Sequence, residues 1–301
     1  MILSILLKLT QALGVSRFLI AGGLFIPLER IAPHRGRKPI FRDGWRTDLA
    51  SFVFNGLIFF ILYYGWRHYL APNGIGWLKP LPAPWNLHGQ HVVVQGLAVM
   101  GIGSLVYYWG HRALHTFTPL WRFHAVHHSI EEMDWLATYR GHVFETFFFT
   151  SLTTIPIVLF GVSQPAGTAF LVYRFLESQI EHSNVRLPLG FLKWVLPSPW
   201  YHHWHHAREA EAQNKNFSPY PVWDVLFRTA YMPAGRLPQS FGTDEPVPKD
   251  YPGQLVYPLM WDRSPRVSTD VRRVAPPEAT IGEDLAAGTE GEAISAAGRA
   301  G

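Results

Sequence analysis

The sequence predicts an all-α integral membrane protein with four to five membrane-spanning helices. Hydrophobic residues make up 48% of the 301 residues and aromatic residues 15%, whereas charged residues make up only 16%. A soluble domain usually carries about 25% charged residues, so this deficit favours a membrane protein. Long apolar segments separated by charged loops are the second observation, because a helix that crosses a bilayer needs about 20 mainly apolar residues.

The apolar segments follow one another along the first 180 residues. Aromatic residues gather at their ends, as they do at membrane interfaces. The N-terminal stretch up to Leu28 is apolar but contains Lys8 and Arg17, so whether it spans fully is left open. The other four predicted spans are residues 49–66, 92–109, 143–160 and 165–180.

Loop charge predicts how these segments are oriented. The loop from Arg30 to Arg46 carries six Lys and Arg residues, whereas the loop from Ala71 to His91 carries only Lys79. Positively charged loops stay on the cytoplasmic side, so the first loop is expected in the cytoplasm and the second outside. The span that begins at Val92 then returns to the cytoplasmic face, and the next two spans form a hairpin that leaves this face and comes back.

Histidine is frequent and clustered. Eleven of the 15 His lie between His111 and His206, at the predicted cytoplasmic ends of the spans. Eight of them form boxes with the patterns HxxxH, HxxHH and HxxHH, and spacings of three and four residues bring side chains to one face of a helix. The eight are His111 and His115, then His124, His127 and His128, and finally His202, His205 and His206.

Eight imidazoles on one face of a membrane predict a cytoplasmic helical cap that carries a dimetal site. A structural zinc ion needs four ligands, so eight nitrogens suit two ions. The absence of Cys excludes thiolate sites, and imidazole ligands suit Zn, Cu, Fe or Ni. Four carboxylates could orient the imidazoles, although surface charge would explain them as well: Asp134, Glu145, Glu177 and Glu181.

The remaining histidines are not expected to bind metal from their spacing. His203 lies inside the third box but does not share the face of its neighbours. His34, His68, His88 and His91 are isolated in the sequence.

The sequence around the boxes resembles the fatty acid hydroxylase and sterol desaturase superfamily of integral membrane oxygenases. The resemblance covers roughly residues 44–233. Two departures from the family pattern are Val143, where Pro is frequent, and Arg228, where Gly is frequent. The matching segments are Trp109-Gly-His-Arg-Ala-Leu-His, Leu120-Trp-Arg-Phe-His-Ala-Val-His-His-Ser, Arg140-Gly-His142-Val-Phe-Glu145, Glu181-His182-Ser-Asn184-Val, Trp200-Tyr-His-His-Trp-His-His, Lys215-Asn-Phe and Trp223-Asp224.

This resemblance implies a histidine-ligated pair of iron ions with O2 as co-substrate, and adds His142 and His182 as metal ligands. It implies hydroxylation or desaturation of a lipid-like substrate from the bilayer, such as a sterol or a fatty acyl chain. The sequence has no glycine-rich nucleotide fingerprint after a strand, so electrons are expected from a ferredoxin or from a cytochrome with its reductase. Zinc could replace iron on overexpression, because nitrogen sites bind Zn²⁺ more tightly than Fe²⁺.

Two alternative functions use the same histidines. A membrane zinc-dependent hydrolase would need a general base, but the HExxH pattern that supplies one is missing. A metal-binding transport protein should place His along a path within the bilayer, whereas these boxes gather at one face. Nucleic acid is not an expected partner, because no basic run alternates with exposed aromatic residues.

A change in composition divides the chain into two parts. Residues 1–262 are expected to form the membrane-embedded domain. Residues 263–301 are rich in Ala, Gly, Glu, Pro and Ser and have few large apolar side chains. Such a segment cannot bury enough surface to offset the entropy of ordering, so a disordered C-terminal tail is predicted.

Overall fold

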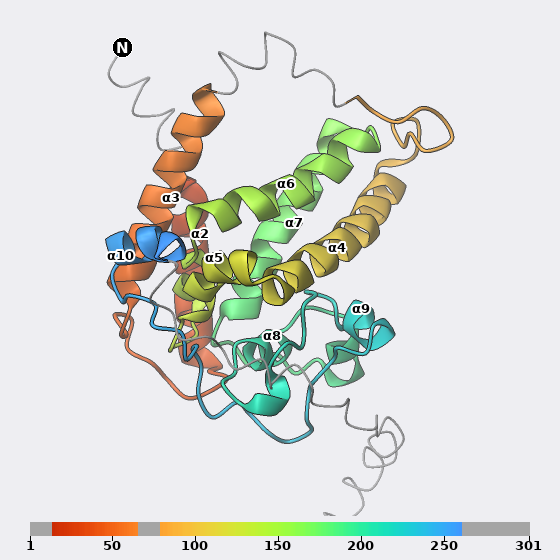
Figure 1. Cartoon of the computed structure of the whole chain (residues 1–301). Coiled ribbons are helices and arrows are strands. Elements are labelled where there is room, and N and C mark those ends of the chain that lie inside the picture. Colours follow the sequence, from red (N-terminus) through yellow and green to blue (C-terminus); the bar gives the residue numbers. More distant parts are fainter. Residues whose placement is uncertain (1–13, 66–78, 261–301) are drawn as a thin grey trace, which may run out of the picture. The chain divides into compact units, whose positions relative to one another are not determined.

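The computed structural model describes residues 14–65 and 79–260, and its regular secondary structure is helical (Figure 1). Within these residues there is no β-strand, and only two isolated bridges occur, Pro33 with Val185 and Ala207 with Phe241. The all-α prediction is therefore confirmed for this part of the chain. Three predicted parts lie outside the described residues: residues 1–13 of the N-terminal stretch, residues 66–78 with His68 and the first part of the second loop, and the tail, residues 263–301.

Contacts divide the chain into two units. Of the described residues, 233–236 belong to the second unit and all others to the first. All the helices below lie in the first unit.

Five long helices occur where the sequence predicts spans. Two of them, α4 and the 45–62 part of α3, are long and apolar enough to cross a membrane. α6 is apolar but has 17 residues, and α7 contains Arg174, Glu177 and Glu181. The helices are confirmed, whereas the number of spans stays a prediction. Their bounds are α2 (Val15–Ile31), α3 (Trp45–Gly65), α4 (Val92–Thr116), α6 (Val143–Leu159) and α7 (Gln164–His182).

Short helices make up the part that carries most of the box histidines (Figure 1). α4 ends at Thr116 and α5 starts two residues later, because Pro119 fits the first turn of a new helix but not the interior of an old one. α7 packs on α8, and α4 packs on α5 and α9. The bounds are α5 (Thr118–His128), η3 (Trp135–Tyr139), η4 (Gly190–Trp194), α8 (Pro199–His205), η5 (Ala210–Ala212), α9 (Pro221–Leu226), α10 (Tyr251–Val256) and η6 (Tyr257–Leu259).

α4 and α6 approach each other closely beside the first box. A Cβ atom on Gly110 would clash with Cδ1 of Leu152, so only glycine fits there without a shift of the Leu152 side chain. His111 follows directly in the chain. The close approach of the two helices therefore helps to set the position of this histidine.

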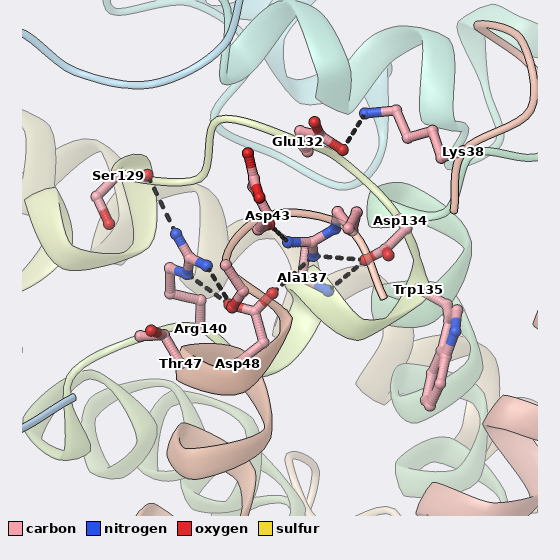
Figure 2. Close-up of polar contacts among 12 residues, drawn as sticks. Lys38, Asp43, Thr47, Asp48, Ser129, Glu132, Asp134, Trp135, Ala137 and Arg140 are labelled. Carbon is pink, nitrogen blue, oxygen red and sulfur yellow. Dashed lines mark hydrogen bonds and ion pairs between the residues drawn. The ribbon is translucent and has the colours of Figure 1, made fainter. Parts of the chain in front are cut away.

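A buried ionic network joins the start of α3 to the loop after α5 (Figure 2). Oδ2 of Asp48 accepts from Nη2 of Arg42 at 2.6 Å, and its Oδ1 accepts from Nε of Arg140 at 2.5 Å. The same Nη2 of Arg42 donates to Oδ1 of Asp134 at 2.6 Å. Because removing one partner of a buried ion pair is strongly unfavourable, the network fixes residues 134–140 against α3.

Gly44 allows this network to close. Its φ of +81° lies in the left-handed region, and a Cβ atom would lie 2.3 Å from Nη2 of Arg140. The Gly44 carbonyl accepts a hydrogen bond from that same nitrogen at 3.0 Å. Glycine is thus needed both for the turn and for the approach of the guanidinium.

Replacing Asp48 with Asn should destabilise the protein, because Arg42 and Arg140 would lose the buried carboxylate between them. We expect a loss of about 3–5 kcal/mol, measured as a lower thermal denaturation midpoint in detergent. Lys249→Gln is the control, since Lys249 and Glu131 form an exposed pair worth at most about 1 kcal/mol. Equal losses in the two variants would contradict a special role for the network.

Candidate metal centre

The structure brings the eight box histidines together with His182, in two adjacent groups. Within each group the candidate ligand atoms lie within 4.8 Å of one another. The rings of His128 and His206, one from each group, stack with centroids 4.5 Å apart. The first group contains His111, His115, His124, His128 and His205, and the second contains His127, His182, His202 and His206.

Each HxxHH box contributes to both groups. Four residues along a helix turn a side chain by about 40° past a full revolution, whereas three leave it about 60° short. His124 and His128 therefore point to the first group, and His127 points to the second. The third box divides in the same way: His202 and His206 belong to the second group, and His205 belongs to the first. The sequence suggested four box nitrogens for each metal, but the box histidines divide five to three, and His182 completes the second group.

Backbone carbonyls fix the orientation of four of these rings. A carbonyl oxygen can only accept a hydrogen bond, so Nδ1 of each ring carries the proton and Nε2 of the neutral ring has a free lone pair. The four Nδ1–H groups belong to His111, His127, His182 and His205, and they donate to the carbonyls of Phe217 (2.6 Å), Arg140 (2.7 Å), Ser178 (3.0 Å) and Lys215 (2.8 Å), respectively.

In the second group these lone pairs face one another. Nε2 of His127 and Nε2 of His182 lie 3.2 Å apart, although neither carries a proton. Burial lowers the pKa of His127 to about 4, so this ring is neutral near pH 7. Facing lone pairs repel each other unless a cation lies between them. Nitrogens about 3 Å apart match the edge of a coordination shell whose metal–nitrogen bonds are about 2.1 Å.

The same short spacing recurs through both groups. In the second group, Nε2 of His202 lies 3.1 Å from Nε2 of His182 and 3.1 Å from Nε2 of His206. In the first group, the Nε2 atoms of His111 and His124 are 2.9 Å apart, and those of His128 and His205 are 3.0 Å apart. The donor set consists of neutral imidazoles and fits a transition metal or zinc, not Mg²⁺ or Ca²⁺.

All four carboxylates singled out in the sequence are buried, at most 7% exposed, so the surface-charge explanation is wrong. Among these four carboxylates, Glu145 pairs with a box histidine in the described part of the chain, with its Oε1 3.2 Å from Nδ1 of His124. A carboxylate in this position orients the imidazole and strengthens it as a ligand. Asp134 pairs with Arg42, and Glu177 pairs with Arg174.

His142 and His203 belong to neither group within the described residues. His142 is the N-cap of α6: its Nδ1 accepts from the Phe144 amide at 3.0 Å, and its Nε2 donates to the Leu255 carbonyl at 3.0 Å. Both nitrogens are therefore used in the fold, and the structure does not bring this predicted ligand to the others. His203 is fully buried with its ring against Phe241, outside both groups as expected.

The loop at residues 214–217 supplies two of the orienting carbonyls, a role that the sequence did not reveal. Asn214 and Asn216 have φ values of 57° and 58°, a left-handed conformation that Asn tolerates better than most residues. Asp224 fixes the end of the loop, because its two oxygens accept from the amides of Phe217 and Ser218 at 2.8 Å each. The motifs Lys215-Asn-Phe and Trp223-Asp224 thus hold the first histidine group in place.

Comparison with known proteins agrees with this arrangement. Residues 96–229, which contain all three boxes, match the family model for fatty acid hydroxylase. Over these residues the chain is similar to the fatty acid hydroxylase superfamily. Together with the two long apolar helices, this similarity indicates a membrane protein.

Three curated relatives each match more than half of the chain. An ornithine lipid hydroxylase from Rhizobium tropici is 32% identical over 185 residues, which are 59% of this chain and 53% of the relative. The human alkylglycerol monooxygenase is 27% identical over 188 residues, 62% of this chain and 38% of the relative. A very-long-chain aldehyde decarbonylase from Oryza sativa is 27% identical over 249 residues, 75% of this chain and 38% of the relative. The matches thus span about half or less of these relatives' lengths. No solved structure matches the chain significantly.

His127→Ala should lower the metal content of the purified protein, because it removes one of the facing nitrogens of the second group. His142→Ala and His88→Ala should retain the metal content of the wild type, since the first is an N-cap and the second is exposed. Metal per chain is measured by inductively coupled plasma mass spectrometry. Unchanged metal in His127→Ala, or loss of metal in His142→Ala, would contradict this assignment of ligands.

Proposed function

We propose that this chain is an O2-dependent hydroxylase of a lipid-like substrate and that its two histidine groups each hold one iron ion. The observation that carries the proposal is the set of nine clustered imidazoles, in which eight Nε2 atoms lie about 3 Å from a neighbouring Nε2 and the His127–His182 pair has no proton between its nitrogens. The relatives named above are a hydroxylase, a monooxygenase and a decarbonylase, and two of their names specify lipids or long chains. Their names favour hydroxylation over desaturation.

The proposed iron ions would use O2 and two electrons to oxidise an unactivated C–H bond, with one oxygen atom entering the product and the other leaving as water. The protein's contribution is to hold the ligands. The carbonyls of Phe217 and Arg140 keep two of the ligand nitrogens free of protons, and Glu145 orients a third ring. Burial of the histidines limits the access of water to the site.

An apolar cavity of about 340 Å³ between α4 and α7 supports an alkyl chain as part of the substrate. Gly96 and Met100 line one side, and Phe170 and Tyr173 line the other. Its volume falls in the usual range for ligand pockets. Both helices run from the cavity toward the histidines, and the 11 residues from Met100 to His111 span about 16 Å at 1.5 Å per residue. An extended chain of a lipid substrate could bridge this distance.

We further propose that the enzyme is a multi-pass membrane protein with the histidine site on the cytoplasmic face, as the loop charges predict. Electrons would come from a ferredoxin or from a cytochrome with its reductase. The lipid substrate would enter from the bilayer.

Reconstitution with iron tests the proposal. Metal-free protein loaded anaerobically with Fe(II) should bind close to two ions per chain. With O2, a reduced ferredoxin system and a lipid extract, it should consume O2 and give products heavier by one oxygen atom in mass spectrometry. Zinc in an inactive preparation would not decide the question, because nitrogen sites bind Zn²⁺ more tightly than Fe²⁺. Turnover by the zinc form without O2 uptake would instead establish a hydrolase.

Gly96→Phe should obstruct the cavity and reduce lipid turnover by about tenfold, which corresponds to about 1.4 kcal/mol. Its metal content should not change, because a Cβ atom at Gly96 meets no heavy atom within 4 Å and the site lies far along α4. Gly23→Phe, at an exposed position of α2, is the matched control and should keep full turnover. Equal activity of the two variants would show that the cavity does not hold the substrate.

A further inference from the structure

An exposed apolar surface lies on η4 and α9, outside the predicted spans. η4 and α9 contact each other, so their side chains form one patch. Phe191 is 79% exposed and Leu226 is 63% exposed. Continuous apolar patches are rare on surfaces that face water and mark contacts with proteins or membranes. The other exposed members are Leu192, Trp194, Val195, Leu196, Val222 and Val225.

α9 is attached to the candidate membrane span α4 well before the end of that helix. Nε1–H of Trp223 donates to Oγ of Ser104 at 2.8 Å. The Phe227 ring packs on the rings of Tyr108 and Trp109, with centroids 4.8 and 5.0 Å apart. Ser104 and Trp109 belong to the predicted membrane-spanning part, residues 92–109. The patch is therefore level with the inner end of this span and not beyond it.

The charges around the patch are basic. Residues 186–196 contain Arg186 and Lys193 and no acidic residue, and residues 221–228 contain Arg228. The one acidic residue in these segments, Asp224, is fully buried and accepts hydrogen bonds from backbone amides. Nζ of Lys193 lies 5.7 Å from the ring centre of Trp194. Trp beside Lys is typical of membrane interfaces, where the ring and the lysine stem lie among lipids and the ammonium reaches the phosphates.

We propose that η4 and α9 insert into the headgroup region of an anionic phospholipid leaflet. The contact would be made by the part of the fold that holds the histidines, in addition to the spans. The inference rests on the membrane placement of α4 in the proposed function. Asp224 of α9 fixes Phe217, and the Phe217 carbonyl orients His111. The inserted patch would thereby hold the first histidine group beside the leaflet that supplies the lipid substrate.

Single-cysteine spin labelling tests this insertion, because the chain has no native Cys. Phe191→Cys and Leu226→Cys are labelled with a nitroxide in vesicles of phosphatidylcholine with phosphatidylglycerol. Leu97→Cys on the exposed side of α4 is the lipid reference, and Gln239→Cys at an exposed loop position is the water reference. We expect the two patch labels to resemble the lipid reference, with high collision rates with O2 and at least fivefold lower collision rates with a water-soluble nickel chelate than the Gln239 label.

Charge reversal tests the choice of an anionic leaflet. Lys193→Glu combined with Arg228→Glu should make the Phe191 label more accessible to the nickel chelate, by about twofold or more, without altering the Leu97 label. Thermal denaturation midpoints close to that of the wild type would show that the two substitutions, at half-buried Lys193 and exposed Arg228, leave the fold intact.

Three results would overturn the proposal. Patch labels as accessible to the nickel chelate as the Gln239 label would place the patch in water. Spin–spin broadening between patch labels would show that a second copy of the chain covers it. A water-exposed Leu97 label would show that α4 does not lie in the membrane, and the membrane placement of the patch would fail with it. None of these measurements needs turnover, so failure here is distinguishable from failure of the proposed oxygenase activity.

Discussion

The site depends on four hydrogen bonds from imidazole Nδ1–H groups to backbone carbonyls. They place the proton of each ring on its outer side and leave a free lone pair on the inner Nε2, and the lone pairs of His127 and His182 are directed at each other. Side-chain packing alone would not stabilise such an arrangement, because the lone pairs repel at about 3 Å. A cation bound between the nitrogens removes this repulsion. The arrangement of the histidines therefore fits a bound cation, whose charge the neutral rings do not supply.

This constraint extends to parts of the chain that contribute no ligand. The Arg140 carbonyl orients His127, while the Arg140 side chain is held by Asp48 at the start of α3 (Figure 2). Asp224 of α9 plays a comparable part for His111 through the amide of Phe217. The apolar helices and the short helices are thus connected through hydrogen bonds that end at the rings, and a change in either part would move a ligand nitrogen by way of the backbone.

Two ions in adjacent groups, as proposed, would also explain the use of histidine where soluble di-iron proteins use carboxylates. Nine neutral imidazoles bring no negative charge into a buried site next to apolar helices. The buried Glu145 contacts His124 and is not one of the clustered ligand atoms. The same neutrality makes the site accessible to zinc, so the identity of the metal in the cell depends on supply as well as on the ligands.

The sequence by itself determined the all-α class, the positions of the five long helices and the eight box histidines, because hydropathy and i, i+4 spacing are local properties of a helix. Only the tertiary structure decided how the boxes divide into five and three and that His182 joins the smaller set. It also showed that His142 caps α6. These outcomes depend on contacts between distant segments, such as the hydrogen bond from His111 to Phe217 across 106 residues, and no local pattern encodes them.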